Sequence, residues 1–195
     1  MAAHFQTGVN GSYQGTLLVA HPNLEGQLFS KSVIYLYQDL EDAGSAGIIL
    51  NKQTNYSVAQ MFHDKGYIVD DNGEVVHAGG PVNTRSISLL HSKDWRSSNT
   101  VNIGNGLCLT SDNFMFEKIA LGDKPNFYRF FVGHCGWSPG QLEAEVMGQM
   151  GYSRESSWLT TSYNRSIVFD YTAVNQWEQA VNHCSTNLID RFFET

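Results

Sequence analysis

One segment of the chain has the sequence of a strand that turns sharply into a helix: Gly133-His134-Cys135-Gly136-Trp137-Ser138-Pro139-Gly140-Gln141-Leu142-Glu143. Ser138 and Gln141 have the spacing of a capping box, in which each side chain satisfies a backbone N–H of the other residue. Pro139 stands at the first helical position, where the N–H that proline lacks has no partner in any case. Gly136 gives the backbone the freedom to turn. We therefore expect a helix that begins at Ser138, with Trp137 packed over the corner.

The same corner has a possible chemical use, because a helix N-terminus can bind an anion or lower the pKa of a nearby thiol. Cys135 is the thiol in question. Glu143 and Glu145 already occupy the positive end of the helix, and consecutive strand residues such as His134 and Cys135 point to opposite faces. A catalytic Cys135 would need a histidine from elsewhere: His21, His63, His77 or His91. The corner is thus chiefly architectural, and a site is expected beside it rather than in it.

Most of the remaining chain has the pattern of strands. Bulky residues on both faces of 127–132 indicate a central strand. Further short apolar or β-branched runs predict strands at 15–20, 32–37, 46–51, 75–78, 86–91 and 167–169. The short link between the second and third of these suits an antiparallel hairpin.

Four helices are expected, and they do not alternate regularly with the strands. Capping residues place their starts at Ser57, at Thr110 or Ser111, at Ser138 and near Thr172. The last helix carries an apolar stripe of Val174, Trp177, Val181, Cys184 and Leu188. This order predicts an α+β fold with a largely antiparallel sheet.

Length and composition predict one globular domain. The 195 residues are 42% hydrophobic and 16% charged, which is enough apolar material for a sizeable core without metal or disulfide. Residues 1–13 are interpreted as a flexible tail and residues 14–195 as the single domain.

The charge balance argues against nucleic-acid binding. The net charge is −7, and the sequence contains no run of Lys and Arg. Such a run would be needed to displace counterions from nucleic-acid phosphates. Three widely spaced cysteines do not make a disulfide framework. The start of the sequence lacks the regions of a signal peptide, and no apolar run reaches the length of a membrane span. These features predict a cytoplasmic protein.

Other segments that could hold a ligand have simpler structural interpretations. Gly79-Gly80-Pro81 could expose N–H groups as an anion nest, but such glycines more often bend a strand. The seven histidines lack paired metal-ligand spacing. No Walker, dinucleotide-binding or nucleophile-elbow motif is present. We therefore expect no metal and no cofactor.

Four segments, taken in order, resemble the motifs of the YqgE/AlgH family. They are Gly15-Thr16-Leu17-Leu18-Val19-Ala20-His21-Pro22, Ala46-Gly47-Ile48-Ile49-Leu50-Asn51-Lys52, His77-Ala78-Gly79-Gly80-Pro81-Val82 and Gly133 to Glu145. The resemblance covers about residues 14–185. It implies an α+β fold whose sheet bends into a partly closed, barrel-like form. The family has no agreed catalytic residues, although AlgH-type members have been named transcriptional regulators. Cys135 stands where the family usually has a small residue, and His134 where an aromatic residue is usual.

These observations favour a non-enzymatic regulatory or binding protein of the YqgE/AlgH type, acting on a protein or a small ligand. The predicted contact surface comprises Asn51, Gly79, Gly80, Pro81, His91, His134, Cys135, Gly136 and Trp137. One alternative is a small-molecule enzyme, hydrolytic or thiol-dependent, that uses His91 or His134 with Cys135. A further alternative is a DNA-binding transcriptional regulator, although no basic helix is present to read DNA.

Overall fold

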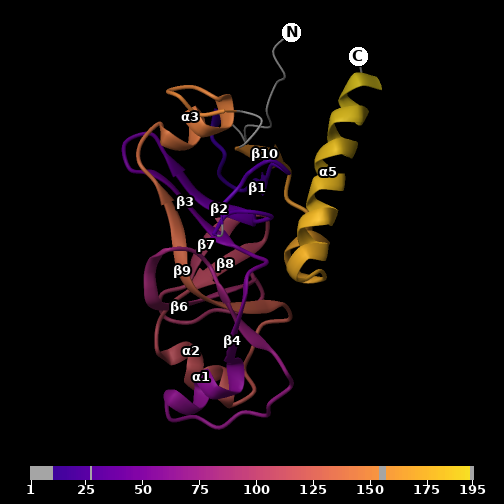
Figure 1. Cartoon of the computed structure of the whole chain (residues 1–195). Coiled ribbons are helices and arrows are strands. Elements are labelled where there is room, and N and C mark those ends of the chain that lie inside the picture. Colours follow the sequence, from indigo (N-terminus) through magenta and orange to yellow (C-terminus); the bar gives the residue numbers. More distant parts are fainter. Residues whose placement is uncertain (1–10, 27, 154–156, 194–195) are drawn as a thin grey trace. The chain divides into compact units, whose positions relative to one another are not determined.

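The computed structural model describes residues 11–26, 28–153 and 157–193. They form two compact units (Figure 1). Unit 1 comprises Met1–Asn51 and Cys135–Thr195, and unit 2 comprises Lys52–His134. Residues 1–10 of the predicted tail lie outside the described residues. Tyr13 is buried, and its backbone N–H donates to Asp39 Oδ2 at 2.6 Å, so ordered structure includes residues before position 14.

Unit 1 contains an antiparallel sheet. Its strands, in order across the sheet, are β10 (Trp158–Thr161), β1 (Leu17–Ala20), β2 (Val33–Leu40), β3 (Gly44–Ile49) and the end of β9 (Tyr128–Trp137). The β2–β3 pair confirms the predicted hairpin, with Ile34 opposite Ile49. Strand β10 was not predicted.

The helices of unit 1 are α3 (Gln141–Met147), α4 (Arg165–Phe169) and α5 (Ala173–Phe193). The last helix begins where the sequence predicts. Its buried face includes Ala180 and Cys184, whereas Val174 of the predicted stripe is exposed. One face of the sheet packs into an apolar cluster that includes Ile34, Cys135 and Leu142.

Unit 2 contains the start of β9 and five further strands: β4 (Gln53–Ser57), β5 (Val75–Ala78), β6 (Val82–Ser92), β7 (Val101–Gly104) and β8 (Leu107–Thr110). The pairs β4–β5, β6–β8, β7–β8 and β6–β9 are antiparallel. The pair β5–β9 is parallel. The largely antiparallel α+β prediction is therefore confirmed.

Two short helices lie side by side in unit 2, at the bottom of the view (Figure 1): α1 (Val58–Asp64) and α2 (Phe114–Ala120). Ser57 caps α1 as predicted and accepts from the Gln60 N–H at 3.0 Å. The Phe62 ring lies 5.3 Å from the Phe116 ring and 5.6 Å from the Phe130 ring. These edge-to-face contacts hold both helices against β9.

The expected barrel-like closure is wrong. Among the described strands, the order β10-β1-β2-β3-β9-β6-β8-β7 has two ends that do not pair with each other, so the sheet is not closed. The described residues contain five helices rather than the expected four. The additional helix is α4, which covers the predicted strand 167–169. Asn164 starts this helix by accepting from the Ile167 N–H at 3.2 Å. The apolar run that follows predicts a strand instead, and this N-cap was not predicted.

Two other helix starts also differ from the prediction. Helix α2 has Asn113 at its N-cap instead of Thr110 or Ser111, because Asp112 Oδ1 accepts from the Met115 N–H at 2.9 Å. Helix α3 begins three residues after Ser138. Within the described ranges, no helix has the length and apolar character needed to cross a membrane; the cytoplasmic setting stays a prediction.

Candidate functional site

The corner between β9 and α3 in unit 1 is built on a close backbone approach. Gly44 has φ +79°, and a Cβ there would collide with the Trp137 carbonyl oxygen. Beyond Trp137 the Ser138 N–H donates to Gln141 Oε1 at 3.0 Å, which is one half of the predicted capping box. Gly140, in the left-handed region at φ 73°, stands at the N-cap. Pro139 therefore precedes the helix instead of opening it.

A carboxylate on α3 holds the corner together. Glu145 Oε2 accepts from the indole N–H of Trp137 at 3.1 Å and from that of Trp158 at 2.8 Å. Glu145 Oε1 accepts from Gln141 Nε2 at 2.9 Å, and the Glu145 carbonyl accepts from the Ser157 hydroxyl at 2.7 Å. Trp137 is 7% exposed, so its predicted packing over the corner is confirmed.

The cysteine of the corner lacks the surroundings of a reactive thiol. Cys135 is 1% exposed and belongs to the apolar core. Burial raises the pKa of its thiol to about 12, whereas reactive cysteines have a lowered pKa and some exposure. His134, the preceding residue of β9, is half-buried, and burial lowers the pKa of its ring. The geometry thus argues against a thiol mechanism at Cys135.

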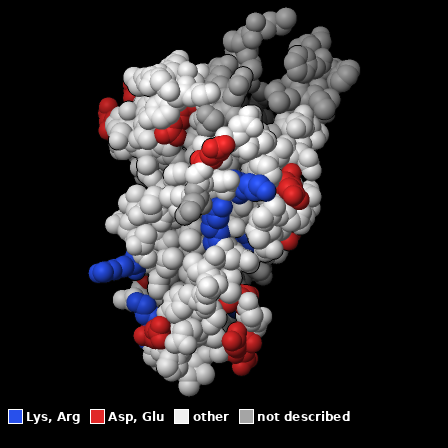
Figure 2. Space-filling model, in the orientation of Figure 1, with Lys and Arg blue, Asp and Glu red and all other residues white. Residues whose placement is uncertain are grey.

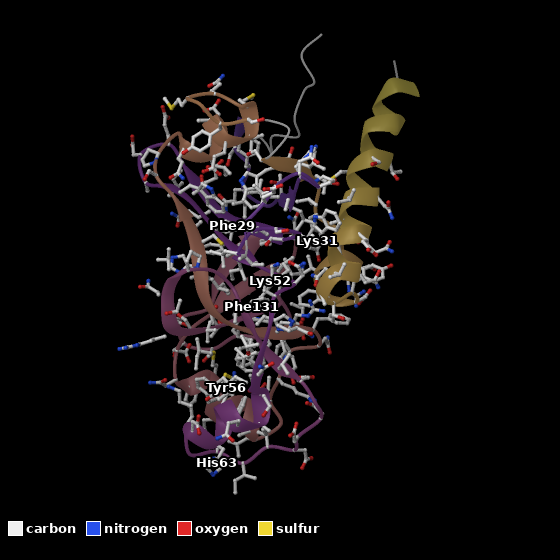
Figure 3. The ribbon with its side chains drawn as sticks, in the orientation of Figure 1. Phe29, Lys31, Lys52, Tyr56, His63 and Phe131 are labelled. Atoms are coloured by element: carbon white, nitrogen blue, oxygen red, sulfur yellow. The ribbon has the colours of Figure 1, made fainter. Side chains whose placement is uncertain are left out.

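Asn51 is a structural link in unit 1. Its Oδ1 accepts from the Val33 N–H at 2.9 Å. Its Nδ2 donates to the carbonyls of Lys31 at 2.7 Å and Ala173 at 3.1 Å. The side chain is buried, and it joins the start of β2 to the start of α5. Figure 3 shows Lys31 beside α5, where its ammonium lies 5.6 Å from the centre of the Trp177 ring.

The Gly79-Gly80-Pro81 segment lets two strands of unit 2 approach each other. The Gly79 N–H donates to the Val132 carbonyl at 2.8 Å. A Cβ on Gly133, which has φ +71°, would collide with the Gly80 carbonyl oxygen. Pro81 is exposed. The segment therefore forms a bend between strands. The Gly79 N–H is hydrogen-bonded within the sheet and is not available to an anion.

His91 has both ring nitrogens engaged inside unit 2. Nδ1 lies 2.8 Å from the Ser92 carbonyl, which only accepts, so Nδ1 carries a proton. Nε2 lies 2.9 Å from the Thr110 hydroxyl, which lies 2.6 Å from that of Thr100. Burial is the largest cause that lowers the pKa of the ring. The neutral ring therefore accepts from Thr110, and His91 is a fixed part of the fold.

The predicted contact surface is divided between the two units. Asn51, Cys135, Gly136 and Trp137 belong to unit 1, and Gly79, Gly80, Pro81, His91 and His134 belong to unit 2. Most of these residues have a structural role within their own unit. A common surface formed by all nine stays a prediction.

A hollow of about 440 Å³ lies in unit 2, away from the residues that the sequence singled out. It is bordered by α1, the loop 68–74, the end of α2 and the start of β9. Its lining residues include Val58, Phe62, Ile119, Tyr128 and Phe130. The available sequence signals were the apolar positions of the two helices and the turn at Asp70-Asp71-Asn72-Gly73. These signals predicted elements but not the depression between them.

Carboxylates stand at the rim of this hollow. Asp70 and Glu74 line it from the loop, and Lys124 lines it from the segment after α2. Burial, and secondarily the charge of Glu74, raises the pKa of the Tyr128 hydroxyl. Glu74 and Tyr128 both line the hollow. At the end of α1, labelled by His63 in Figure 3, Asp64 accepts from the Tyr56 hydroxyl at 2.6 Å.

A second hollow, of about 320 Å³, lies beside the corner in unit 1. It is lined by Asp39, Glu41 and Glu143 among others. Asp39 is committed to the fold, since it accepts from the Tyr13 N–H and from the Ser45 hydroxyl, both at 2.6 Å. In the part of the chain that the structure describes, no group of three or more His, Cys, Asp or Glu side chains could hold a metal ion.

The surface drawn in Figure 2 carries Lys and Arg side chains among Asp and Glu, without a continuous basic band. The whole excess of negative charge belongs to unit 1, with eleven Asp and Glu against four Lys and Arg. Unit 2 has eight of each. This balance gives no support to electrostatic binding of nucleic acid.

Comparison with known proteins identifies the family. A UPF0301 protein of Methylococcus capsulatus is 31% identical over 176 residues, covering 89% of this chain and 92% of that protein. One of Saccharophagus degradans is 31% identical over 182 residues, covering 91% and 84%. The solution structure of the AlgH protein from Pseudomonas aeruginosa aligns with a TM-score of 0.73 at 23% identity, over 92% of each chain. A crystal structure of a Corynebacterium diphtheriae protein aligns with a TM-score of 0.68 at 23% identity, over 92% and 88%. The family model described as AlgH-like matches residues 17–189, so the resemblance is confirmed and the chain belongs to the AlgH-like (UPF0301) family.

Proposed function

We infer that this chain is a non-enzymatic binding protein whose contact surface is the hollow in unit 2. The observation that carries the proposal is a depression that has buried apolar side chains beneath it and the exposed apolar side chain of Ile68 beside it. The side chains of Val58, Ile119 and Phe130 line a depression, whose volume lies within the range of about 300–1,000 Å³ typical of ligand sites. Convergent polar groups at its rim supply the means to orient a partner.

The surroundings of the candidate catalytic residues, Cys135 and His91, support the same proposal. The thiol of Cys135 is buried and its pKa is raised to about 12. Both ring nitrogens of His91 are engaged by Ser92 and Thr110. A nucleophile needs an activating base within reach, and neither of these candidates has the surroundings for that role.

The test separates binding from turnover. The 195-residue chain, labelled with ¹⁵N, is mixed with fractions of a bacterial extract, and amide shifts of Val58, Ile119 and Tyr128 are followed by NMR. The same mixtures are analysed by mass spectrometry for metabolites that disappear. We expect shifts at the hollow without consumption of any compound beyond the amount of protein. Catalytic consumption of a defined metabolite, with no shift at the hollow, would overturn the proposal.

The hydrolytic alternative is favoured by one contact in unit 1. The Ser162 hydroxyl lies 3.4 Å from His183 Nε2, a pairing of nucleophile and base that is found in hydrolases. A Ser162→Ala variant decides its importance. Loss of a measured hydrolysis in this variant would establish the enzyme, and unchanged activity would remove the pair from consideration.

A further inference from the structure

We propose that the hollow in unit 2 takes a basic segment of another protein, which inserts one large apolar side chain between positively charged neighbours. This inference rests on the proposed binding function and specifies its partner. It follows from the floor of the hollow, the apolar surface around it and the charges at its rim.

The floor fits an apolar side chain. Phe62 and Phe130 are fully buried beneath it, and Val58 and Ile119 are each 8% exposed. An aliphatic or aromatic side chain that enters the hollow covers the small exposed parts of Val58 and Ile119. It also removes its own apolar area from water, at about 25 cal/mol per Å². Large apolar anchors in a pocket are the usual centres of protein interfaces.

The apolar surface continues beyond the hollow. Ile68, which lines it, is 91% exposed. Leu121, between the lining residues Ala120 and Gly122, is 80% exposed. Exposed apolar surface around a depression marks an interaction site. An extended chain segment can cover both residues as well as the floor, whereas a small molecule held in the hollow would leave them in water.

The rim favours positive charge. Asp70 and Glu74 line the hollow, and Asp71 lies between them in the sequence. Lys124 also lines the hollow, so two lining carboxylates stand against one lining cation. Two further cations, Lys65 just after α1 and Lys118 on α2, lie over buried rings. The Lys65 ammonium lies 5.5 Å from the centre of the Phe116 ring, and that of Lys118 lies 4.8 Å from the centre of the Trp95 ring.

The carboxylate-bearing loop is held in place before binding. Asp71 Oδ1 accepts from the Gly73 N–H at 3.0 Å, and Asn72 Oδ1 accepts from the Glu74 N–H at 3.2 Å. The Glu74 carbonyl accepts from the Val58 N–H at 2.9 Å. The loop is thereby tied to the start of α1, so less ordering is needed when a partner binds. Charges at the rim that complement those of the partner mainly raise the rate at which the two proteins associate and make that rate depend on salt concentration.

The experiment uses the 195-residue chain and a blocked pentapeptide with a central Phe and two Lys on each side. Because unit 1 carries the negative excess, NMR shifts must locate the peptide. We expect shifts at Val58, Ile119 and Tyr128 and a dissociation constant of about 100 μM, as in weak interfaces. Replacing the peptide's Phe by Ala, or its Lys by Glu, is expected to weaken binding about tenfold or more, in keeping with one lost anchor or a reversed charge.

Matched variants test the apolar and the acidic contributions of the hollow separately. Ile68→Ser and Glu74→Gln are each expected to weaken the Phe–Lys peptide about threefold, which is about 0.7 kcal/mol. Val101→Ser removes another exposed apolar side chain of unit 2, on β7. Glu41→Gln neutralises a carboxylate of the unit 1 hollow. Both controls should leave the affinity unchanged.

The outcomes separate this inference from the function on which it rests. If the Glu-flanked peptide binds the hollow as tightly as the Lys-flanked one, the basic partner is wrong and the binding function stands. The partner class is also wrong if a small aromatic amine, phenethylamine, binds there as tightly as the peptide. If the peptide shifts only unit 1 while an extract fraction shifts the hollow, this inference alone fails. If neither shifts the hollow, both fail.

Discussion

The corner of unit 1 and the hollow of unit 2 use their side chains in opposite ways. At the corner, the Glu145 carboxylate accepts from Trp137, Trp158 and Gln141. At the hollow, apolar side chains of two helices and a strand lie just beneath a depression, and its rim carries Asp70, Glu74 and Lys124. The corner is the most recognisable segment of the sequence, yet its groups are occupied by the fold. A recognisable motif can therefore mark a structural constraint, while the surface available to a partner lies elsewhere.

The largest expected effect comes from adding one methyl group at the corner. In Gly44→Ala the new Cβ would collide with the Trp137 carbonyl oxygen, and the residue would keep φ +79°. Overpacking and a left-handed alanine together should cost about 4 kcal/mol of unfolding free energy. Gly140→Ala has a similar φ of +73° but open space around the Cβ, and should cost about 1 kcal/mol. Urea denaturation measures both. Equal losses would show that close approach is unimportant at this corner.

The next test removes the Glu145 carboxylate of α3. Glu145→Ala leaves two indole N–H groups without their acceptor, and should cost about 3 kcal/mol. Glu143→Ala, at an exposed position of the same helix, should change stability by less than about 0.5 kcal/mol. Hydrogen exchange of the amides of β10 and of the end of β9, residues 135–137, would locate the loss in unit 1. A Glu145→Ala variant as stable as Glu143→Ala would contradict the role given to this network.

A buried histidine makes unit 2 sensitive to acid. His77 is 5% exposed, its ring lies 5.4 Å from that of Phe131, and neither ring nitrogen has a well-aligned hydrogen-bond partner. Burial, together with the Arg129 charge, lowers its pKa to about 4, against a smaller opposing effect of the Val75 carbonyl. The folded state thus favours the neutral ring. Its stabilisation is present above the unfolded pKa of 6.5 and is lost as the pH falls towards 4.

The size of this effect follows from proton linkage. Between pH 8 and pH 5, His77 should account for a loss of about 2 kcal/mol of unfolding free energy. A His77→Leu variant should therefore lose less stability over this range than the parent. His63→Leu, at a side chain that is 77% exposed, serves as the control and should follow the parent curve. Denaturant titrations at each pH provide the comparison. A His77→Leu curve parallel to the parent would exclude the linkage.

The sequence predicted the elements better than their relations. The β2–β3 hairpin and the Ser57 cap were predicted because each depends on neighbouring residues, which local spacing records. Residues 167–169 were misassigned because an apolar run of three has no period of its own, and the helix depends on Asn164. The open sheet could not be read from the sequence, because the resemblance implied closure and strand order depends on long-range pairs such as β1 with β10.

The candidate site was harder to predict for a similar reason. The hollow joins Val58, Ile119 and Tyr128, which are far apart in the sequence and ordinary in type. Val58 and Ile119 carry no reactive group, and the Tyr128 hydroxyl belongs to no recognisable motif, so a search for reactive side chains passes over them. The residues that did attract attention, such as Asn51 and His91, are buried polar groups. Buried polar groups need hydrogen-bond partners inside the fold. The polar atoms of Asn51 and His91 are therefore already engaged and are not available to a ligand.

The smallest expected effect tests how firmly the hollow is held. In Ser57→Ala the Gln60 N–H loses its acceptor at the start of α1, and about 1 kcal/mol of unfolding free energy should be lost. Asn113, the N-cap of α2, makes no such side-chain bond, so Asn113→Ala should change stability by less than about 0.5 kcal/mol. Because Val58 follows Ser57 directly and lines the hollow, amide exchange of Val58 should accelerate in the first variant and not in the second. Equal exchange in both would mean that the floor is held by the aromatic contacts of Phe62 alone, and the helix cap would then have no part in shaping the site.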